Sequence, residues 1–258
     1  MKRLLFVVIL ITAFVCVKQI LVNTDTQVTD PVVSPAASPT PKLLVTPKSP
    51  TATPTRKPTA TPTPKSVYID GLSFSAQAPF GDWKDPIQQD GCEEASVLTA
   101  VYWAQGKSFT KAEALELIKK ISAYEIEKYG SSRDTSAEDT ENRLIRGYFN
   151  YANSQVKIVN NINDIITWLH SGNLVIVPAN GQKMNNPNFT APGPDRHMVV
   201  IRGYDVARDE FITNDVGTRQ GENYHYPSSI LFSAIRDYPT GDHLPIENVS
   251  KKAILVWK

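Results

Sequence analysis

Apolar residues in the middle of the chain recur every three or four positions, which is the spacing of one face of an α-helix. The first such stretch is carried by Ala95, Leu98 and Val101, and Gly106 follows as a stop signal. A second stretch reads TKAEALELIKKI and repeats the spacing with leucine and isoleucine. The pattern predicts two helices, the first of which begins at or near Cys92.

Helix-start signals mark two further helices. Residues 137–151 follow Thr135 and Ser136, either of which can cap a helix, and carry acidic residues in the first turn. The run DIITWLH follows Asn163 as a cap and is closed by Gly172. We therefore expect four helices before the sequence pattern changes.

The pattern then shifts to short apolar runs rich in β-branched and aromatic residues. These runs are NLVIVP at 173–178, which Pro178 ends, HMVVIRGYD at 197–205, EFITND at 210–215 and the final AILVWK. Turn residues bound them, as is typical of strands. DVARDE joins the second run to the third and is interpreted as a hairpin loop. Helices followed by an antiparallel sheet predict an α+β domain, with the N-terminal helices packed on the sheet.

The N-terminal part of the chain differs in composition from the rest. Residues 1–22 begin with two basic residues and continue in an apolar run, which indicates an export signal or an N-terminal membrane anchor. Residues 23–66 are rich in Pro, Thr, Ser and Lys, so we expect a disordered linker there. Residues 67–258 then suit one globular domain. This organisation predicts an extracellular or cell-surface protein.

Charge and cysteine content limit the classes of function that this domain can have. The formal net charge is +1 at pH 7 and no basic run interrupts the domain, so we expect no nucleic-acid partner. Cys92 is the only cysteine after Cys16. Export would place it where thiols tend to oxidise. A cysteine without a partner there is either buried and inert or chemically useful.

The position of Cys92 at a helix start favours a chemical role. The positive end of the helix dipole stabilises a thiolate and so raises nucleophilicity at neutral pH. Glu93 and Glu94 follow it directly and would oppose the thiolate if they pointed toward the sulfur, so a compensating cation is needed. The alternative is a small buried residue on a core helix.

Two residues of the predicted hairpin can complete a catalytic set. His197 begins its strand after a turn-rich segment, where it can face a cleft and pair with Cys92. Asp215 ends the neighbouring strand and can orient the imidazole, with Asn214 as the second choice. Taken singly, each also fits a structural histidine or a capping carboxylate. The remaining histidines, His170, His225 and His243, are expected to be structural or at the surface.

The segments GCEEAS, RHMVVIRGYD and FITNDVG, in this order and spacing, resemble the bacteriocin-processing cysteine peptidases. The resemblance is to the exported, non-transporter members, the peptidase family C39-like domains. It covers nearly all of residues 67–258 and implies a papain-like fold. One departure is the glutamate after the cysteine, where transporter-linked members carry glycine. Nothing in the sequence resembles an ATP-binding site, so processing of bacteriocin leaders is not implied.

The resemblance implies a role for each matching residue. Cys92 would be the nucleophile, His197 the general base and acid, and Asp215 the orienting residue. A glutamine would stabilise the oxyanion, for which we favour Gln77, while Gln88 and Gln89 lie nearer in sequence. The implied reaction is hydrolysis of a peptide or protein substrate through an acyl-enzyme, by a monomer that needs no cofactor or metal.

Two other functions share the expected fold. A catalytically silent module would bind peptides or cell-wall fragments in the same cleft, and the glutamates beside Cys92 favour this alternative. A transglutaminase-like acyltransferase would use the same triad but transfer the acyl group to an amine. In each case residues 179–195 are expected to form one wall of the cleft and Trp83 the opposite side.

Overall fold

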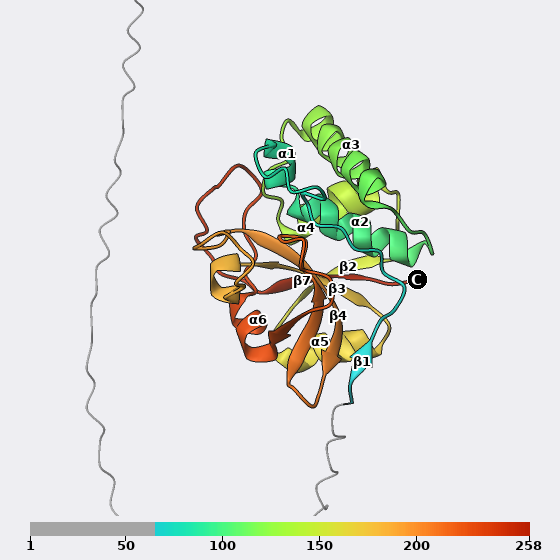
Figure 1. The fold of residues 1–258 in the computed structure, drawn as a ribbon, viewed down its shortest axis with the longest axis vertical. Helices are drawn as coiled ribbons and strands as arrows, with labels where there is room; N and C mark the ends of the chain where they lie inside the picture. The colour runs from blue at the N-terminus through green and yellow to red at the C-terminus, as the bar shows by residue number, and fades with distance from the viewer. Residues whose placement is uncertain (1–64) are drawn as a thin grey trace, which may run out of the picture. The chain divides into compact units, whose positions relative to one another are not determined.

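A computed structural model describes residues 65–258 of the chain. The order of elements, shown in Figure 1, is β1 (Val67–Tyr68), α1 (Pro86–Gln89), α2 (Cys92–Ala104), α3 (Lys111–Tyr129), α4 (Ala137–Asp139), the π-helix η1 (Thr140–Tyr148), β2 (Ser154–Ile158), α5 (Ile162–His170), β3 (Leu174–Ala179), the 3₁₀-helix η2 (Gly181–Met184), β4 (His197–Asp205), β5 (Glu210–Asn214), β6 (Tyr224–Pro227), α6 (Ser228–Ala234) and β7 (Lys252–Val256). The predicted α+β class, with N-terminal helices packed on an antiparallel sheet, is confirmed.

The sheet has seven strands within the described residues, in the order β2-β7-β3-β4-β5-β6, with β1 added beside β4. All of its pairings are antiparallel. Strands β4 and β5 form the predicted hairpin, with Asp205 opposite Glu210. Asp215 is the first residue beyond β5, so it lies near the start of β4, where His197 is.

Helices cover both faces of the sheet, which explains why its central strands are almost wholly apolar. On β4, Met198 and Val200 pack into a core shared with α2 and α3. The alternate residues Val199 and Ile201 pack into a second core with α5 and α6. Figure 1 shows the two helical layers on opposite sides of the strands. Cys92 belongs to the first core and is 7% exposed.

Local sequence explains how the longer helices start and end. The side chain of Thr110 caps α3 by accepting from the N–H of Glu113, whose carboxylate reaches back to the N–H of Thr110 (2.7 Å). Gly130 ends α3 in the left-handed conformation, with φ of 85°. Helix α2 begins without a side-chain cap, because Gly91 holds the N-cap position. The first N–H groups of α2 are therefore not capped by a side chain.

Several details of the predicted elements were wrong. The cap of α5 is Asn161 rather than Asn163, because Asn161 has Asp164 three residues later to complete a capping box. Strand β3 continues through Pro178, whose carbonyl still accepts from the N–H of Arg236 (2.9 Å). The predicted helix at 137–151 is a short α-helix followed by a π-helix. Elements α1, β1, β2, η2, β6 and α6 were not predicted.

The predicted N-terminal regions lie almost wholly outside the described residues. The export signal or anchor (1–22) is not described, and neither is most of the linker (23–66). Within residues 65–258, no helix combines the length and the apolar character needed to cross a membrane.

Candidate active site

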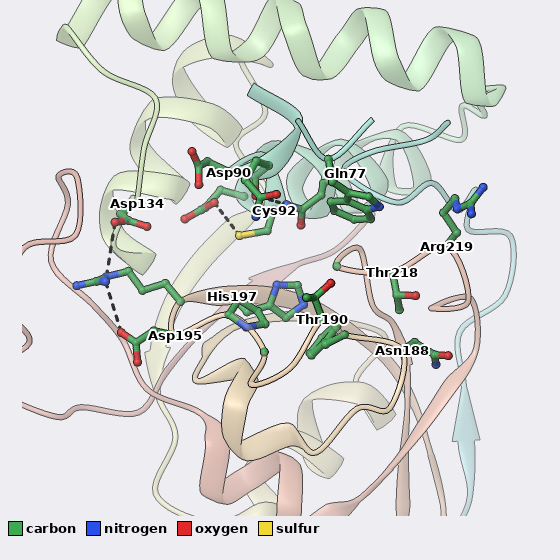
Figure 2. A pocket seen from close by; sticks show the side chains of 18 of the residues that line it. Gln77, Asp90, Cys92, Asp134, Asn188, Thr190, Asp195, His197, Thr218 and Arg219 are labelled. Atoms are coloured by element: carbon green, nitrogen blue, oxygen red, sulfur yellow. Dashed lines mark hydrogen bonds and ion pairs between the residues drawn. The ribbon is translucent and has the colours of Figure 1, made fainter. Parts of the chain in front are cut away.

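A cleft of about 750 Å³ lies between the first turn of α2 and the edge of the sheet where β4 starts. Figure 2 shows Gln77, Asp90 and Cys92 on one side of this cleft, and His197 and Thr190 on the other. Its lining residues are Gln77, Trp83, Gln89, Asp90, Cys92, Glu93, Asp134, Asn188, Phe189, Thr190, Gly193, Pro194, Asp195, Arg196, His197, Gly217, Thr218, Arg219, Gln220 and His243. Of the four residues assigned to catalysis from the sequence, Gln77, Cys92 and His197 line the cleft.

Cys92 is the first residue of α2, so its sulfur lies at the positive end of the helix dipole. Gly91 permits this start, because a Cβ at this position would lie 2.8 Å from the carbonyl oxygen of Ile87 and 3.2 Å from Cγ2 of Ile118. Any larger residue would displace the turn that carries the cysteine. The helix-start position predicted for Cys92 is confirmed.

The thiol has a carboxylate as its hydrogen-bond partner. Cys92 Sγ donates to Oε2 of Glu93 over 2.9 Å. Burial raises the pKa of the Cys92 thiol well above its ordinary value, and the charges of Glu93 and Glu94 raise it further. A hydrogen bond with the backbone of Met198, directly after His197, acts in the opposite direction. At neutral pH the thiol therefore carries its proton in this structure.

His197, in the cleft wall, is hydrogen-bonded to Asp215 behind it. His197 Nε2 lies 2.8 Å from Oδ1 of Asp215, and both side chains are buried. An ionised carboxylate can only accept, so Nε2 carries the proton and Nδ1 of the neutral ring keeps a free lone pair. Asp215 thus fixes both the tautomer and the orientation of the ring, as an orienting residue does.

Further donors hold the carboxylate of Asp215. Its Oδ2 accepts from the hydroxyl of Tyr226 and from Nδ2 of Asn186 (3.2 Å), while Oδ1 accepts from the N–H of Gly217 (3.0 Å). Burial acts to raise the pKa of Asp215, but the charge of His197 and the hydrogen bonds from His197 and Tyr226 lower it overall. Tyr226 and Asn186 were missed, since nothing in the local sequence of either indicates that it points at Asp215.

The imidazole is enclosed by two neighbours. The ring of Phe189 meets His197 edge-to-face, with centroids 5.4 Å apart. Gly217 lies against the other part of the ring, where a Cβ would come within 2.7 Å of His197 Cε1. Phe189 belongs to the segment 179–195, part of which lines the cleft together with Trp83.

The three glutamines considered for the oxyanion site differ in position. Gln77 lines the cleft, and its Nε2 donates to the carbonyl oxygens of Gln88 (3.0 Å) and Gln89 (2.7 Å). Gln89 also lines the cleft, whereas the side chain of Gln88 is turned to Asp85 (2.8 Å). Gln77 is therefore beside the nucleophile, but both of its amide hydrogens are already donated to the backbone.

The remaining sequence candidates lie apart from the His197–Asp215 pair. Asn214, the second choice for the orienting residue, accepts from Arg202 (3.4 Å) and does not contact His197. His225 pairs with Glu210 over 3.0 Å, outside the cleft. His243 does line the cleft, at one end, where it bonds Asp134 over 2.8 Å.

One group of three potential metal ligands occurs among residues 65–258, made up of Asp134, Asp242 and His243. Arginines already pair with both carboxylates: Arg133 lies 2.9 Å from Asp242, and Arg196 lies 3.6 Å from Asp134. The same Arg196 guanidinium also pairs with Asp195 over 3.4 Å, and dashed lines mark the ion pairs of Asp134 and Asp195 in Figure 2. The positive charges beside these carboxylates oppose a bound cation.

The chain is similar to a known family of peptidases. The family model described as "Peptidase_C39 like family" matches residues 72–238. Among solved structures, the chain is similar to a candidate C39-like peptidase from Bacillus anthracis, with 16% sequence identity and a TM-score of 0.42. That alignment covers 75% of this chain and 98% of the other. No curated protein matches the chain.

Proposed function

The chain belongs to the Peptidase_C39 like family, and from this premise we propose that it hydrolyses peptide bonds with Cys92, His197 and Asp215 as its catalytic triad. The observation that carries the proposal is the buried His197–Asp215 hydrogen bond of 2.8 Å in the wall of the cleft that also contains Cys92. This pair leaves Nδ1 of His197 free to accept the proton of the thiol.

The reaction follows from these positions. His197 Nδ1 takes the proton of Cys92, and the sulfur attacks the peptide carbonyl carbon to form a tetrahedral oxyanion. The C–N bond then breaks as Nδ1 returns the proton to the leaving amine, which leaves a thioester on Cys92. Water attacks the thioester, gives one proton to Nδ1, and releases the acid product as the sulfur recovers its proton from Nδ1.

The start of α2 supplies the electrostatic part of this mechanism. The backbone N–H of Cys92 is the proposed first donor to the oxyanion, and Gln77 is the proposed second. Gln77 must release one of its two bonds to the carbonyls of Gln88 and Gln89 for this role. The cleft of about 750 Å³ suits a peptide or protein substrate, bound by a monomer.

The test is hydrolysis of fluorescein-labelled casein by the full chain and its variants. We expect Cys92→Ala, His197→Ala and Asp215→Asn each to lower the rate at least about a thousandfold. His225→Ala is the matched control, since His225 also pairs with a carboxylate but lies outside the cleft. Full activity in His197→Ala, with its fold intact by circular dichroism, would overturn the proposed triad.

One observation favours a second function, a silent peptide-binding module. The thiol of Cys92 donates to Glu93, so it is not a thiolate at rest. A binding module would retain peptide in the cleft unchanged, and Cys92→Ala would bind it equally well. Peptide binding without product formation by the wild-type chain would support this alternative.

A further inference from the structure

Glu93 is placed as a specific acceptor for the thiol of Cys92. Its carboxylate is 2% exposed and lines the same cleft. Oε1 accepts from the hydroxyl of Tyr238 (2.8 Å) and from the N–H of Thr135 (3.3 Å), which leaves Oε2 for the thiol at 2.9 Å. The two other donors come from distant parts of the chain, so the tertiary fold fixes this carboxylate beside the sulfur.

The groups around this contact do not favour a thiolate. Glu94 points away from the cleft to Ser122 on α3 (2.5 Å), and within residues 65–258 neither oxygen of Glu125 has a hydrogen-bond partner. The titratable groups near Cys92 and Glu93 are Glu94 from α2, Glu125 from α3, Asp134 from the segment before α4 and Tyr238 from the segment after α6. His197 from β4 lines the same cleft. Arg143 and Arg196 lie beyond the carboxylates of Glu125 and Asp134. Of the groups named here that line the cleft beside Cys92, His197 is the one placed to take up the proton of the thiol.

We propose that Glu93 is a positioning residue that holds the Cys92 thiol protonated at rest, and that catalysis starts when the thiol exchanges this acceptor for His197. The inference rests on the proposed function. In the exchange, Sγ–H turns away from Oε2 of Glu93 and toward Nδ1 of His197, which lines the same cleft and then takes the proton. Burial raises the pKa of Glu93, and its hydrogen bonds with Cys92 and Tyr238 oppose that rise. The donors Tyr238 and Thr135 continue to hold Oε1 during the exchange.

This arrangement would let Cys92, which is a free cysteine among residues 65–258, persist in an exported domain. The thiolate is the form that oxidants and alkylating agents attack, so a protonated thiol reacts slowly with both. Glu93 therefore protects Cys92 between turnovers. Its cost is a lower reactivity at neutral pH than a free thiolate would have.

Glu93→Gln tests the proposal with little change in shape. The amide oxygen can still accept from Tyr238 and Thr135, while the amide nitrogen then faces the sulfur as a donor. We expect alkylation of Cys92 by iodoacetamide at pH 7 to become about three- to tenfold faster in the full chain, because a lower thiol pKa outweighs its weaker nucleophilicity. Mass spectrometry of the peptide that contains Cys92 measures the rate.

Glu94→Gln is the matched control, because Glu94 is equally buried and adjacent but bonds Ser122 instead of Cys92. We expect a clearly smaller acceleration in this variant. If Glu93→Gln folds poorly, Glu93→Asp provides a second test, since the shorter side chain withdraws the carboxylate from the sulfur. An unchanged rate in a folded Glu93 variant, or an equal acceleration in Glu94→Gln, would overturn the proposal.

Casein hydrolysis separates this inference from the proposed function. Faster alkylation of Glu93→Gln, with no hydrolysis by any variant or by the wild type, would contradict the peptidase function. It would still support the proposal that Glu93 holds the Cys92 thiol protonated. Hydrolysis by the wild type, with unchanged alkylation in Glu93→Gln, would contradict only the proposed role of Glu93. Faster alkylation together with loss of hydrolysis would make Glu93 a required proton acceptor, which contradicts the proposed positioning role.

Discussion

Gly217 sets how closely the backbone approaches the His197 ring. A methyl group there would lie 2.7 Å from Cε1, so Gly217→Ala must move the imidazole or the loop. Because a shift of about 1 Å in a catalytic group can cost on the order of a hundredfold in rate, we expect kcat for casein hydrolysis to fall by about that factor. KM should change little, since the methyl group displaces the base. An unchanged kcat would show that the loop relaxes instead.

Tyr226 supports the ionised form of Asp215 from behind. Tyr226→Phe removes one donor to a buried carboxylate, which costs about 1–3 kcal/mol in the free energy of unfolding. Asp215 has a lowered pKa in the folded protein, so its stabilisation is present above about pH 4 and is lost as the pH falls through the folded value. We therefore expect Tyr226→Phe to unfold at a higher pH on acidification.

Urea denaturation at several pH values measures this effect. Tyr224→Phe is the matched control, because Tyr224 lies two residues away on the same strand and its hydroxyl makes no hydrogen bond within the described residues. A loss of stability in Tyr224→Phe equal to that in Tyr226→Phe would assign the effect to the strand rather than to Asp215.

At the scale of single residues, the sequence identified which side chains could take part in catalysis but not which way they point. The strand order brought Asp215 to the start of β4, so its contact with His197 followed from the predicted hairpin. Whether Glu93 points toward the sulfur depends on Tyr238, which lies 145 positions away along the chain. Such long-range contacts have no local sequence signal.

Helices α2 and α3 pack around buried carboxyl groups. Burial raises the pKa of Glu125 to about 8, and the charge of Glu93 adds to the shift. The unfolded chain has the ordinary value near 4.5. Between about pH 4.5 and pH 8 the unfolded carboxyl group is ionised while the buried one keeps its proton, so stability declines as the pH rises through this range.

Glu125→Gln removes this dependence. We expect the variant to gain about 2–4 kcal/mol relative to the wild type between pH 5 and pH 8 in urea denaturation. Glu127→Gln, on the exposed face of the same helix, should show a flat difference over that range. A constant difference in Glu125→Gln would mean that Glu125 is ionised in the folded protein.

Strands with a clear apolar pattern in their own sequence were predicted. Strands that depend on pairing with a neighbouring strand were not. Strands β3 and β4 are buried on both faces and read as apolar runs. Strand β2 reads SQVKI and β6 reads YHYP, with polar or proline positions that give little strand signal. Each forms a strand because it pairs with the neighbouring strand at an edge of the sheet. The tertiary fold, not the local sequence, brings that neighbouring strand into place.

For the whole molecule, we propose that residues 1–22 direct export and that the domain acts at the cell surface. Expression of the full chain in bacteria, followed by fractionation, should place it in the membrane fraction or the medium. A variant lacking residues 1–22 should remain in the soluble cytosolic fraction, because the apolar run is then absent. Equal distribution of the two forms would contradict the proposal.

Strand β7 lies between β2 and β3, although both precede it by many residues in the chain. During synthesis, β2 and β3 therefore cannot complete the sheet until residues 252–256 have left the ribosome, so the nascent chain exposes two unpaired strand edges until that moment. Because the missing strand fills the interior of the sheet, earlier parts of the domain cannot finish folding on their own. The order of strands thus delays the formation of the sheet until β7 has been synthesised. The cleft around Cys92 forms only when the sheet does.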